Sequence, residues 1–335
     1  MQNNTNLEKS FEETLDFITA NLDFLKNNSN FIDKLEEDER KEYQLLEDKF
    51  KKFKKYKGIK RFSIPIIGMI SSGKSSFLNF LLGFNCLEFG QDITSKCVVI
   101  IRHNRTLSKN EKYIYSVYIK ERSEGYFDFE KNEELKSNDV NKIIKERNEL
   151  IKNSEKNKII KKEDFFLILE ANIPLFSGKN EKYGNYFEFL DLPGLDEGKN
   201  DFIEHKGSKF FSEEILPKLA YNSLFSIFMF DAEKYMRDKN PEIYKDYLKK
   251  FFLNNYTNSF FILNKIDLMK DEETEKKDFE NYMLKNQLNI NLKDTSIHIE
   301  YLSCKNLTRE TKQFDSFQNY LKYLLTEGGN NKRKK

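Results

Sequence analysis

The sequence contains no tryptophan, only three cysteines and three histidines, and no long apolar run. Cys86, Cys97 and Cys304 are widely spaced and are not grouped with histidine at the intervals of metal ligands, which fits a reducing compartment. A membrane-spanning helix needs about 20 consecutive apolar residues. Neither such a run nor the apolar core of a signal peptide occurs. We therefore expect a cytoplasmic protein that is neither secreted nor embedded in a membrane.

An excess of charge of one sign is also absent. The 335 residues include 57 Lys and Arg against 55 Asp and Glu, a formal net charge of +2, so no overall field favours nucleic acid and we expect no nucleic-acid partner. Phenylalanine is abundant instead, with 31 residues that should form the core together with Ile and Leu. The length allows one large domain with additions or two modest domains.

Short apolar runs alternate with helical patterns along most of the chain. Eight runs have the composition of strands, namely residues 61–67, 97–102, 113–119, 165–170, 187–190, 224–230, 259–263 and 297–302. Periodic apolar residues typical of helices occupy residues 75–82, 210–219, 241–253 and 273–288. This alternation predicts an α/β fold with a doubly wound, mainly parallel sheet, flanked by N- and C-terminal helices.

Other segments flank or interrupt this fold. Apolar residues at intervals of three and four predict a helical hairpin over residues 1–57 and a helix over residues 310–326, which leaves residues 58–309 for the main domain. Residues 120–164 are rich in Lys, Glu and Asn and predict a charged, partly helical, solvated insertion. Such a composition is more typical of a low-complexity connection between strands than of a binding element. Residues 327–335 predict a disordered basic tail.

A basic segment precedes the main domain. Residues 49–61 read KFKKFKKYKGIKR, with eight basic residues, no acidic residue and three interleaved aromatic residues. One interpretation is peripheral contact with an anionic membrane. The other, which we favour, is a helix end whose aromatic rings pack inward while its lysines stay solvated.

The strongest motif joins the first strand of the main domain to its first helix. Residues 68–75 read GMISSGKS, which matches G-x-x-x-x-G-K-[ST] in the strand–loop–helix context that this motif requires. Its glycines let backbone N–H groups point at phosphate oxygens, Lys74 would reach the β and γ oxygens, and Ser75 would hold Mg²⁺. The motif therefore predicts a site for a nucleoside phosphate with Mg²⁺.

Four further elements follow in order along the chain. Thr94 lies 20 residues after Lys74, DLPG occupies residues 191–194, NKID occupies residues 264–267 and SCK occupies residues 303–305. The last three each follow a predicted strand directly. Together with the P-loop, this order resembles the TRAFAC class of P-loop GTPases.

The resemblance implies a site for GTP or GDP with Mg²⁺. Asp267 would accept hydrogen bonds from guanine, Lys265 would cover the ring, and Asn264 would tie its loop to the P-loop. The Gly194 N–H would sense the γ-phosphate. The implied metal-binding residues are Ser75, Thr94 and Asp191. The implied nucleotide-binding residues are Gly68, Ser71, Ser72, Gly73, Lys74, Ser75, Ser76, Asp191, Gly194, Asn264, Lys265, Asp267, Ser303, Cys304 and Lys305.

The resemblance is more specific over residues 58–310. The stretch SSGKSSFLN at residues 71–79, the DLPG form of the third element and the gap of 117 residues between Lys74 and Asp191 resemble G domains of the dynamin superfamily. This implies a homodimer formed through the nucleotide-binding face. It also implies that the helices before and after the G domain pack as a bundle, although they equally fit a simple cover for the sheet.

Two positions depart from the patterns of known GTPases. Ile70 stands where dynamins carry a water-orienting glutamine, and Leu195 stands where small GTPases keep one. The implied catalytic residues are therefore Lys74, Ser71 and Thr94. Two hypotheses remain open: a GTPase that is slow as a monomer and is activated by dimerisation, or a GTP-loaded scaffold that needs a partner for hydrolysis.

Overall fold

The computed structural model describes two compact units, Met1–Lys60 and Arg61–Lys335. In the first unit the described residues are Glu36, Glu37, Glu39 and Arg40, where the Arg40 N–H donates to the Glu36 carbonyl in one helical turn. In the second unit the described residues are 61–83, 85–87, 97–121, 127–135, 139–154, 161–176, 184–194, 219, 223, 226–234, 259–269, 271–288, 290 and 298–304. The segments predicted as the hairpin, as the helices at 210–219 and 241–253, as the C-terminal helix and as the tail lie outside these residues, except for the four residues at 36–40 and Leu219.

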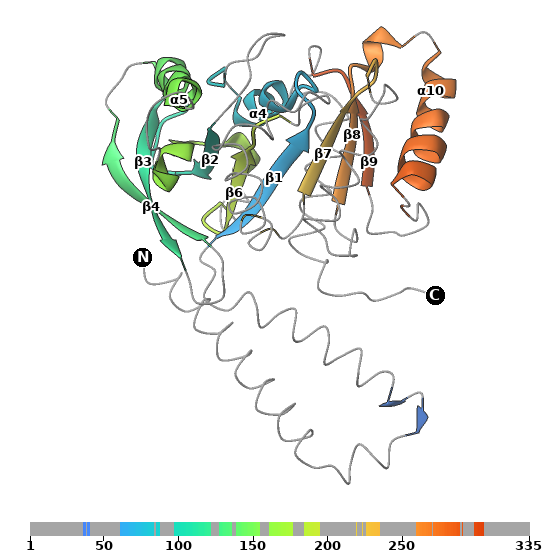
Figure 1. The fold of residues 1–335 in the computed structure, drawn as a ribbon, viewed down its shortest axis with the longest axis horizontal. Coiled ribbons are helices and arrows are strands. Elements are labelled where there is room, and N and C mark those ends of the chain that lie inside the picture. The colour runs from blue at the N-terminus through green and yellow to red at the C-terminus, as the bar shows by residue number, and fades with distance from the viewer. Residues whose placement is uncertain are drawn as a thin grey trace. The chain divides into compact units, whose positions relative to one another are not determined.

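The second unit is built on one nine-stranded sheet with the order β4-β3-β5-β2-β6-β1-β7-β8-β9 (Figure 1). The strands are β1 Phe62–Gly68, β2 Val98–His103, β3 Lys112–Glu121, β4 Phe127–Glu134, β5 Phe166–Ala171, β6 Phe187–Asp191, β7 Ser226–Asp231, β8 Ser259–Asn264 and β9 His298–Leu302. Five of the eight neighbouring pairs are parallel. The predicted α/β fold with a mainly parallel sheet is therefore confirmed.

Helices lie beside both ends of the sheet and next to its central strand (Figure 1). The described ones are α4 Lys74–Leu82, α5 Val140–Ser154, α10 Glu272–Asp278 and the π-helix η6 Phe279–Gln287, with short 3₁₀ turns η1 Lys162–Phe165, η2 Pro174–Phe176 and η5 Ile266–Leu268. Helix α4 ends at Gly83, whose left-handed φ of 78° lets its N–H reach the carbonyls of Asn79 and Phe80. The helix predicted at 273–288 corresponds to α10 followed by η6.

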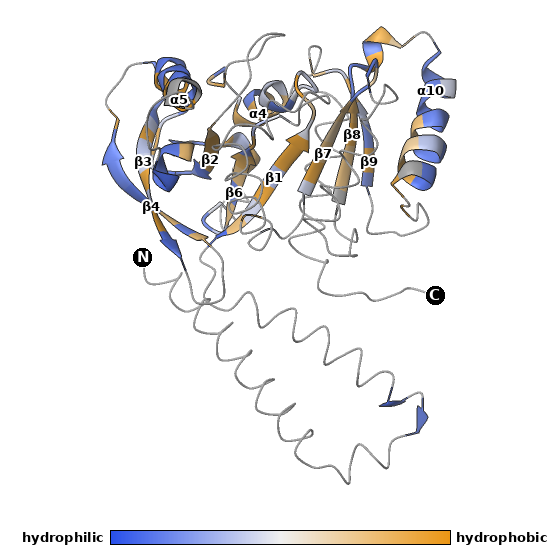
Figure 2. Ribbon diagram, viewed as in Figure 1, coloured by the Kyte–Doolittle hydropathy of each residue, from blue (hydrophilic) through white to orange (hydrophobic). Residues whose placement is uncertain are grey.

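The central strands are buried on both faces, as strands of a parallel sheet covered on both sides must be. Every residue of β2, β5, β6 and β7 is buried. Figure 2 shows the central strands β1, β6 and β7 mainly in the colours of apolar residues. Phenylalanine dominates the large buried side chains, with Phe228 stacked on Phe261 at a centroid distance of 5.4 Å and Phe230 edge-on to Phe279 at 5.0 Å. The composition of the core agrees with the sequence-based expectation.

The prediction of a solvated insertion at residues 120–164 is wrong for part of this segment. Strand β4 pairs antiparallel with β3, and its Phe127 and Phe129 are 1% and 4% exposed. Helix α5 buries Ile144 and Ile151 against the same core. The charged residues between these apolar positions obscured them, because a strand with one buried face needs only alternate apolar residues.

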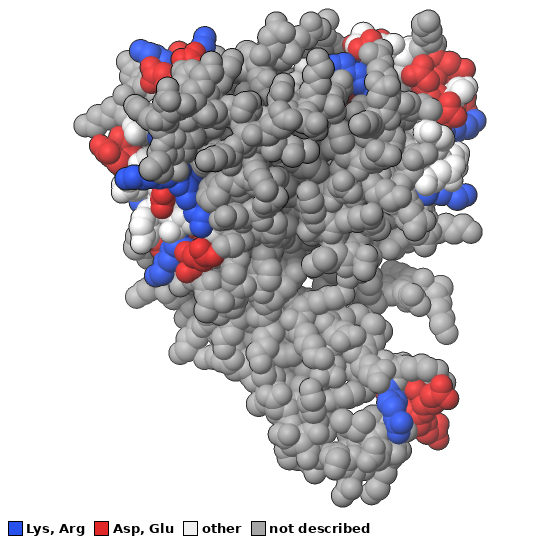
Figure 3. All heavy atoms as spheres, in the orientation of Figure 1, with Lys and Arg blue, Asp and Glu red and all other residues white. Residues whose placement is uncertain are grey.

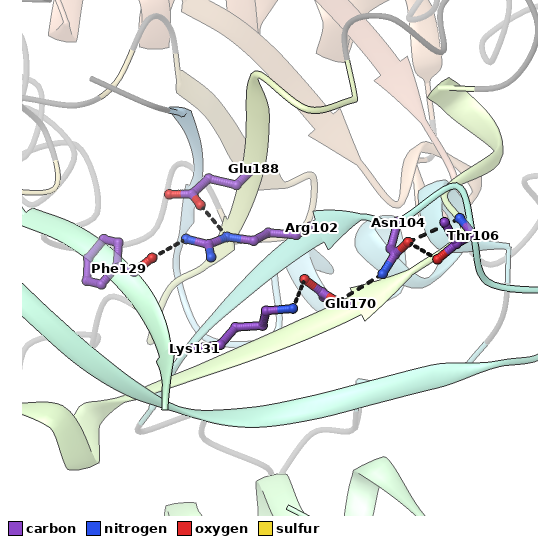
Figure 4. A network of polar contacts seen from close by, with 7 residues as sticks. All are labelled: Arg102, Asn104, Thr106, Phe129, Lys131, Glu170 and Glu188. Atoms are coloured by element: carbon purple, nitrogen blue, oxygen red, sulfur yellow. Dashed lines mark hydrogen bonds and ion pairs between the residues drawn. The ribbon is translucent and has the colours of Figure 1, made fainter. Parts of the chain in front are cut away.

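A buried polar network crosses one face of the sheet (Figure 4). Arg102 on β2 pairs with Glu188 on β6 at 2.9 Å and donates a second hydrogen bond to the Phe129 carbonyl on β4 at 2.8 Å. Ser63 on β1 donates to the other carboxylate oxygen of Glu188 at 2.9 Å. Since Arg102 and Glu188 are 7% and 2% exposed, these contacts satisfy charges that would otherwise be costly to bury.

The described surface carries charges of both signs. Figure 3 shows acidic and basic side chains intermixed near α10 and around β3, β4 and α5. On α10, Lys276 pairs with Glu272 and Lys277 pairs with Glu273, each one helical turn apart. Among the described residues, no helix has both the length and the hydropathy needed to cross a membrane.

Candidate functional site

The P-loop connects the end of β1 to the start of α4. Ser71 and Gly73 adopt left-handed backbone conformations, with φ of 63° and 95°, which curl the loop over the helix N-terminus. Helix α4 has no side-chain hydrogen bond at its N-cap, Gly73. The positive end of α4 and the N–H groups of its first turn are therefore oriented to bind an anion.

Both ends of the loop require glycine, because there is no space there for a Cβ atom. A Cβ on Gly73 would lie 2.1 Å from the Asn264 amide nitrogen. A Cβ on Gly68 would lie 2.5 Å from the Ser72 hydroxyl and 2.6 Å from the Met229 carbonyl oxygen. The loop is thus packed against Met229 within β7 and against Asn264 at the end of β8, which fixes its conformation.

Lys74 is folded onto the loop that it follows. Its ammonium donates to the carbonyls of Gly68 and Met69 at 2.9 and 3.1 Å, and the residue is 7% exposed. Burial lowers the pKa of Lys74 to about 8, with the Asp191 carboxylate acting in the opposite direction. A phosphate oxygen beside this ammonium would favour its charged form, so the position suits a phosphate-binding lysine.

Ser75 and Asp191 meet although 116 residues separate them. The Ser75 hydroxyl donates to Asp191 Oδ2 at 3.3 Å. Asp191 is 3% exposed, and burial raises its pKa to about 6, while Lys74 and Ser75 lower it. Its Oδ1 is buried without a hydrogen-bond partner, which fits a ligand position for a hard cation. Ser75 and Asp191 are therefore suited to hold Mg²⁺ directly or through water.

The DLPG segment lies directly on the P-loop. A Cβ on Gly194 would lie 2.8 Å from Cγ1 of Ile70 and 3.1 Å from its backbone nitrogen. Parallel pairing of β6 with β1 places the two loops together, because both follow the carboxyl ends of adjacent strands. The apolar side chain of Ile70 thus packs at the junction between the two segments.

Asn264 joins three of the motifs. Its amide nitrogen donates to the Ser72 carbonyl of the P-loop at 2.9 Å, and its amide oxygen accepts from the Cys304 N–H at 2.9 Å. The residue is 2% exposed at the end of β8. Asn264 makes the link to the P-loop that the sequence resemblance implied, and it also orients the Ser303–Cys304 turn after β9.

The NKID segment, residues 264–267, is called the base loop below, and it makes a contact that the sequence analysis missed. Lys265, with a left-handed φ of 66°, extends its ammonium to within 2.6 Å of Asp231 Oδ2 at the end of β7. Asp231 is 2% exposed, whereas Asp267 is exposed in η5. The position of Asp231 directly after the predicted strand 224–230 was the only available signal.

The structure gathers most of the predicted site residues at one edge of the sheet. The P-loop follows β1 and the turn at Ser303 follows β9, whereas Asp191, Asp231 and Asn264 are the last residues of β6, β7 and β8. In an open α/β sheet this edge is where ligands bind. Thr94, Leu195 and Lys305 lie outside the described residues. Among those described, no cluster of three or more His, Cys, Asp or Glu side chains is placed to bind a metal ion.

Comparison with solved structures finds chains that are similar to this one at low sequence identity. A chain of an oligomerised bacterial dynamin pair, reported to sense and tether membranes, is 17% identical, with a TM-score of 0.47, over 97% of this chain and 44% of that one. The GTPase Era from Aquifex aeolicus bound to GDP and AlF4⁻ is 18% identical, with a TM-score of 0.38, over 78% of this chain and 57% of that one. The present chain thus spans less than half the length of the bacterial dynamin.

Sequence comparison identifies the family. A search of curated proteins gave no match. The family model described as the dynamin family matches residues 64–266, which is more than half of the chain and extends from β1 to the base loop. On this match the chain belongs to the dynamin family and has the fold of its P-loop GTPase domain.

Proposed function

We propose that this chain binds GTP and GDP with Mg²⁺, hydrolyses GTP slowly as a monomer, and forms a homodimer through its nucleotide-binding face when GTP is bound. The observation that carries the proposal is Asn264, which ties the P-loop to both loops that would read the base. A phosphate site and a base site held together by one buried side chain suit a single nucleotide.

The phosphates would bind at the N-terminus of α4. The Lys74 ammonium would leave the carbonyls of Gly68 and Met69 for the β and γ oxygens, where its charge stabilises the charge that develops during phosphoryl transfer. Ser75 and Asp191, with Thr94, would hold Mg²⁺, which would supply positive charge to offset that of the phosphates. These residues position the triphosphate for in-line attack by water.

The base would bind between the NKID loop and the SCK turn. By the resemblance to TRAFAC GTPases, the Asp267 carboxylate accepts from N1 and the amino group of guanine, which adenine cannot match. The backbone of residues 303–305 supports the guanine oxygen. Specificity for guanine follows, because a buried base leaves mismatched polar groups unpaired.

A second candidate function is a GTP-held scaffold with little hydrolysis of its own. The observation that favours it is the packing of Ile70 on Gly194, which places an apolar side chain where a water-orienting group would act. Ser71 beside it carries a hydroxyl and would be the remaining side chain of the loop able to contact water. Turnover would then depend on Thr94 or on a group supplied by a second protein.

Self-association and location complete the proposal. Family membership supports a dimer through the nucleotide face in a cytoplasmic protein. Contact of the basic segment at residues 49–61 with an anionic membrane surface is the alternative to the solvated helix end that we favour for this segment. Cytoplasmic location and membrane contact are independent of the nucleotide chemistry. Membrane contact is testable by sedimentation with anionic vesicles, and location by fractionation of cells that express the protein.

The decisive experiment is single-turnover GTP hydrolysis measured across a range of protein concentrations. The Lys74→Ala variant gives the blank, and Asp267→Asn should shift binding from guanosine to xanthosine nucleotides. A rate per molecule that rises with concentration supports catalysis activated by dimerisation. GTP that binds but stays intact at every concentration would reject the enzyme in favour of the scaffold, and absence of binding would reject both.

A further inference from the structure

The base loop contains an ion pair that none of its motifs predicts. Lys265 Nζ lies 2.6 Å from Asp231 Oδ2, and the two side chains are 29% and 2% exposed. Asp231 ends β7, whereas Lys265 follows β8. The pair therefore spans the ends of two adjacent strands, at the edge of the sheet where the nucleotide would bind.

Contacts other than the one with Lys265 hold the Asp231 carboxylate in place. Asp231 is paired in register with Asn264 across β7 and β8, and the Ala232 N–H donates to the Asn264 carbonyl at 2.9 Å. The other oxygen of Asp231, Oδ1, accepts from the Glu233 N–H at 3.0 Å. The position of the carboxylate is thus fixed by backbone contacts on its own strand and on its neighbour.

Lys265 is constrained from both ends. Its backbone is left-handed, a conformation that non-glycine residues adopt rarely and mostly where a functional site requires it. Its ammonium is held on Asp231, so the side chain is fixed at its tip as well as at its backbone. A lysine without this ion pair would be ordered only when the ligand binds, and the lost side-chain entropy would then weaken binding.

The pair also determines which carboxylate remains available to a base. Asp267 lies two residues after Lys265 and is exposed. A lysine without Asp231 would be attracted to Asp267, which would mask the carboxylate that reads guanine. The ammonium pairs with Asp231 instead.

We propose that Asp231 is a positioning residue for guanine recognition: it fixes the Lys265 ammonium so that the lysine stem forms a preformed cover for the base and Asp267 stays accessible. This inference rests on the proposed function of the loop as a guanine site. Asp231 itself acts only through Lys265. Its contribution is therefore specific to the base and independent of the phosphates.

The test uses the full chain and two ligands. Binding of GDP and of inorganic tripolyphosphate, both with Mg²⁺, is measured for the wild type and for Asp231→Asn, which keeps the acceptor for the Glu233 N–H and removes the charge. We expect Asp231→Asn to weaken GDP binding about tenfold and to leave tripolyphosphate binding unchanged. Asp231→Glu should recover part of the loss, and thermal unfolding confirms that each variant is folded.

Two controls separate positioning from a general structural role. Asp164→Asn removes another partly buried ion pair, that with Arg147 at 2.7 Å, and should leave both affinities unchanged. In a Lys265→Met background, Asp231→Asn should have no further effect on GDP binding, because the residue it positions is gone.

Three results would overturn the inference. If the wild type binds GDP and Asp231→Asn changes that affinity by less than about twofold, Asp231 does not position Lys265, while the proposed function stands. Equal losses for GDP and tripolyphosphate assign Asp231 a purely structural role. A wild type that binds tripolyphosphate but no guanine nucleotide rejects the proposed function, and the inference with it.

Discussion

At the scale of single residues, the P-loop depends on a glycine whose replacement should be specific in its effect. A side chain at Gly73 would meet the Asn264 amide nitrogen at 2.1 Å, and φ of 95° is unfavourable for any L-residue. Gly73→Ala should therefore displace Asn264 from the Ser72 carbonyl and weaken GTP binding about tenfold or more. Equilibrium titration with a fluorescent GTP analogue measures this loss.

Gly83→Ala provides the matched control. Gly83 has a similar φ of 78° at the C-terminus of α4, away from the site, so alanine there should lower the free energy of unfolding by about 1 kcal/mol. GTP affinity should not change. If both substitutions weaken binding equally, backbone strain rather than the contact with Asn264 governs the site.

Residue-scale prediction from sequence was possible where a motif specifies the spacing. The P-loop, Asp191 and Asn264 were each assigned from short patterns after apolar runs. The structure brings them together, while their roles in binding nucleotide stay predictions. Asp231 was not assigned, because a single acid after a strand has no pattern of its own. Its meaning depends on the register between β7 and β8, which the sequence does not state.

At the scale of secondary-structure elements, the buried pair Arg102–Glu188 should hold four strands together. Glu188→Leu would leave the Arg102 charge buried without its partner, so we expect a loss of about 3–5 kcal/mol in the free energy of unfolding. The double variant Arg102→Met with Glu188→Leu should recover most of this loss, because no unpaired charge remains. Urea unfolding of the wild type, Arg102→Met, Glu188→Leu and the double variant gives the coupling energy.

A different outcome would change the interpretation of this network. If the double variant is as unstable as Glu188→Leu, the hydrogen bonds to Ser63 and to the Phe129 carbonyl, rather than the pairing of charges, stabilise the strands. The exposed pair Lys277–Glu273 is the reference, since its loss should cost less than about 1 kcal/mol.

The elements themselves were predictable to different degrees. Strands of the parallel part are buried on both faces and read as continuous apolar runs, so β1, β6 and β8 were found within one or two residues of their bounds. Strand β4 was missed because only Phe127 and Phe129 among its first residues face the core. The change from α10 to the π-helix η6 could not be predicted, since both fit one apolar periodicity.

At the scale of the whole molecule, the division into two units places the described core entirely in the second. Every buried residue of the hydrophobic core cluster lies between Ile64 and Leu302, and all nine described strands begin after Lys60. The sequence predicted this boundary only approximately, because helical periodicity before Gly58 gives way to a strand without a clear linker. The P-loop strand β1 is central in the sheet, so the second unit contains the whole described nucleotide site.

This arrangement predicts that the fragment Arg61–Lys335 folds on its own. Removing Met1–Lys60 deletes none of the described core, so the fragment should unfold in one cooperative transition. Its affinity for GDP should stay within about threefold of that of the full chain, a difference below 1 kcal/mol. Calorimetry and fluorescence titration provide the two measurements, with Lys74→Ala in the fragment as the binding control.

A fragment that aggregates, or that unfolds without a cooperative transition, would mean that the first unit supplies packing that the second requires. Normal folding with greatly weakened GDP binding would instead indicate that the first unit regulates the nucleotide site.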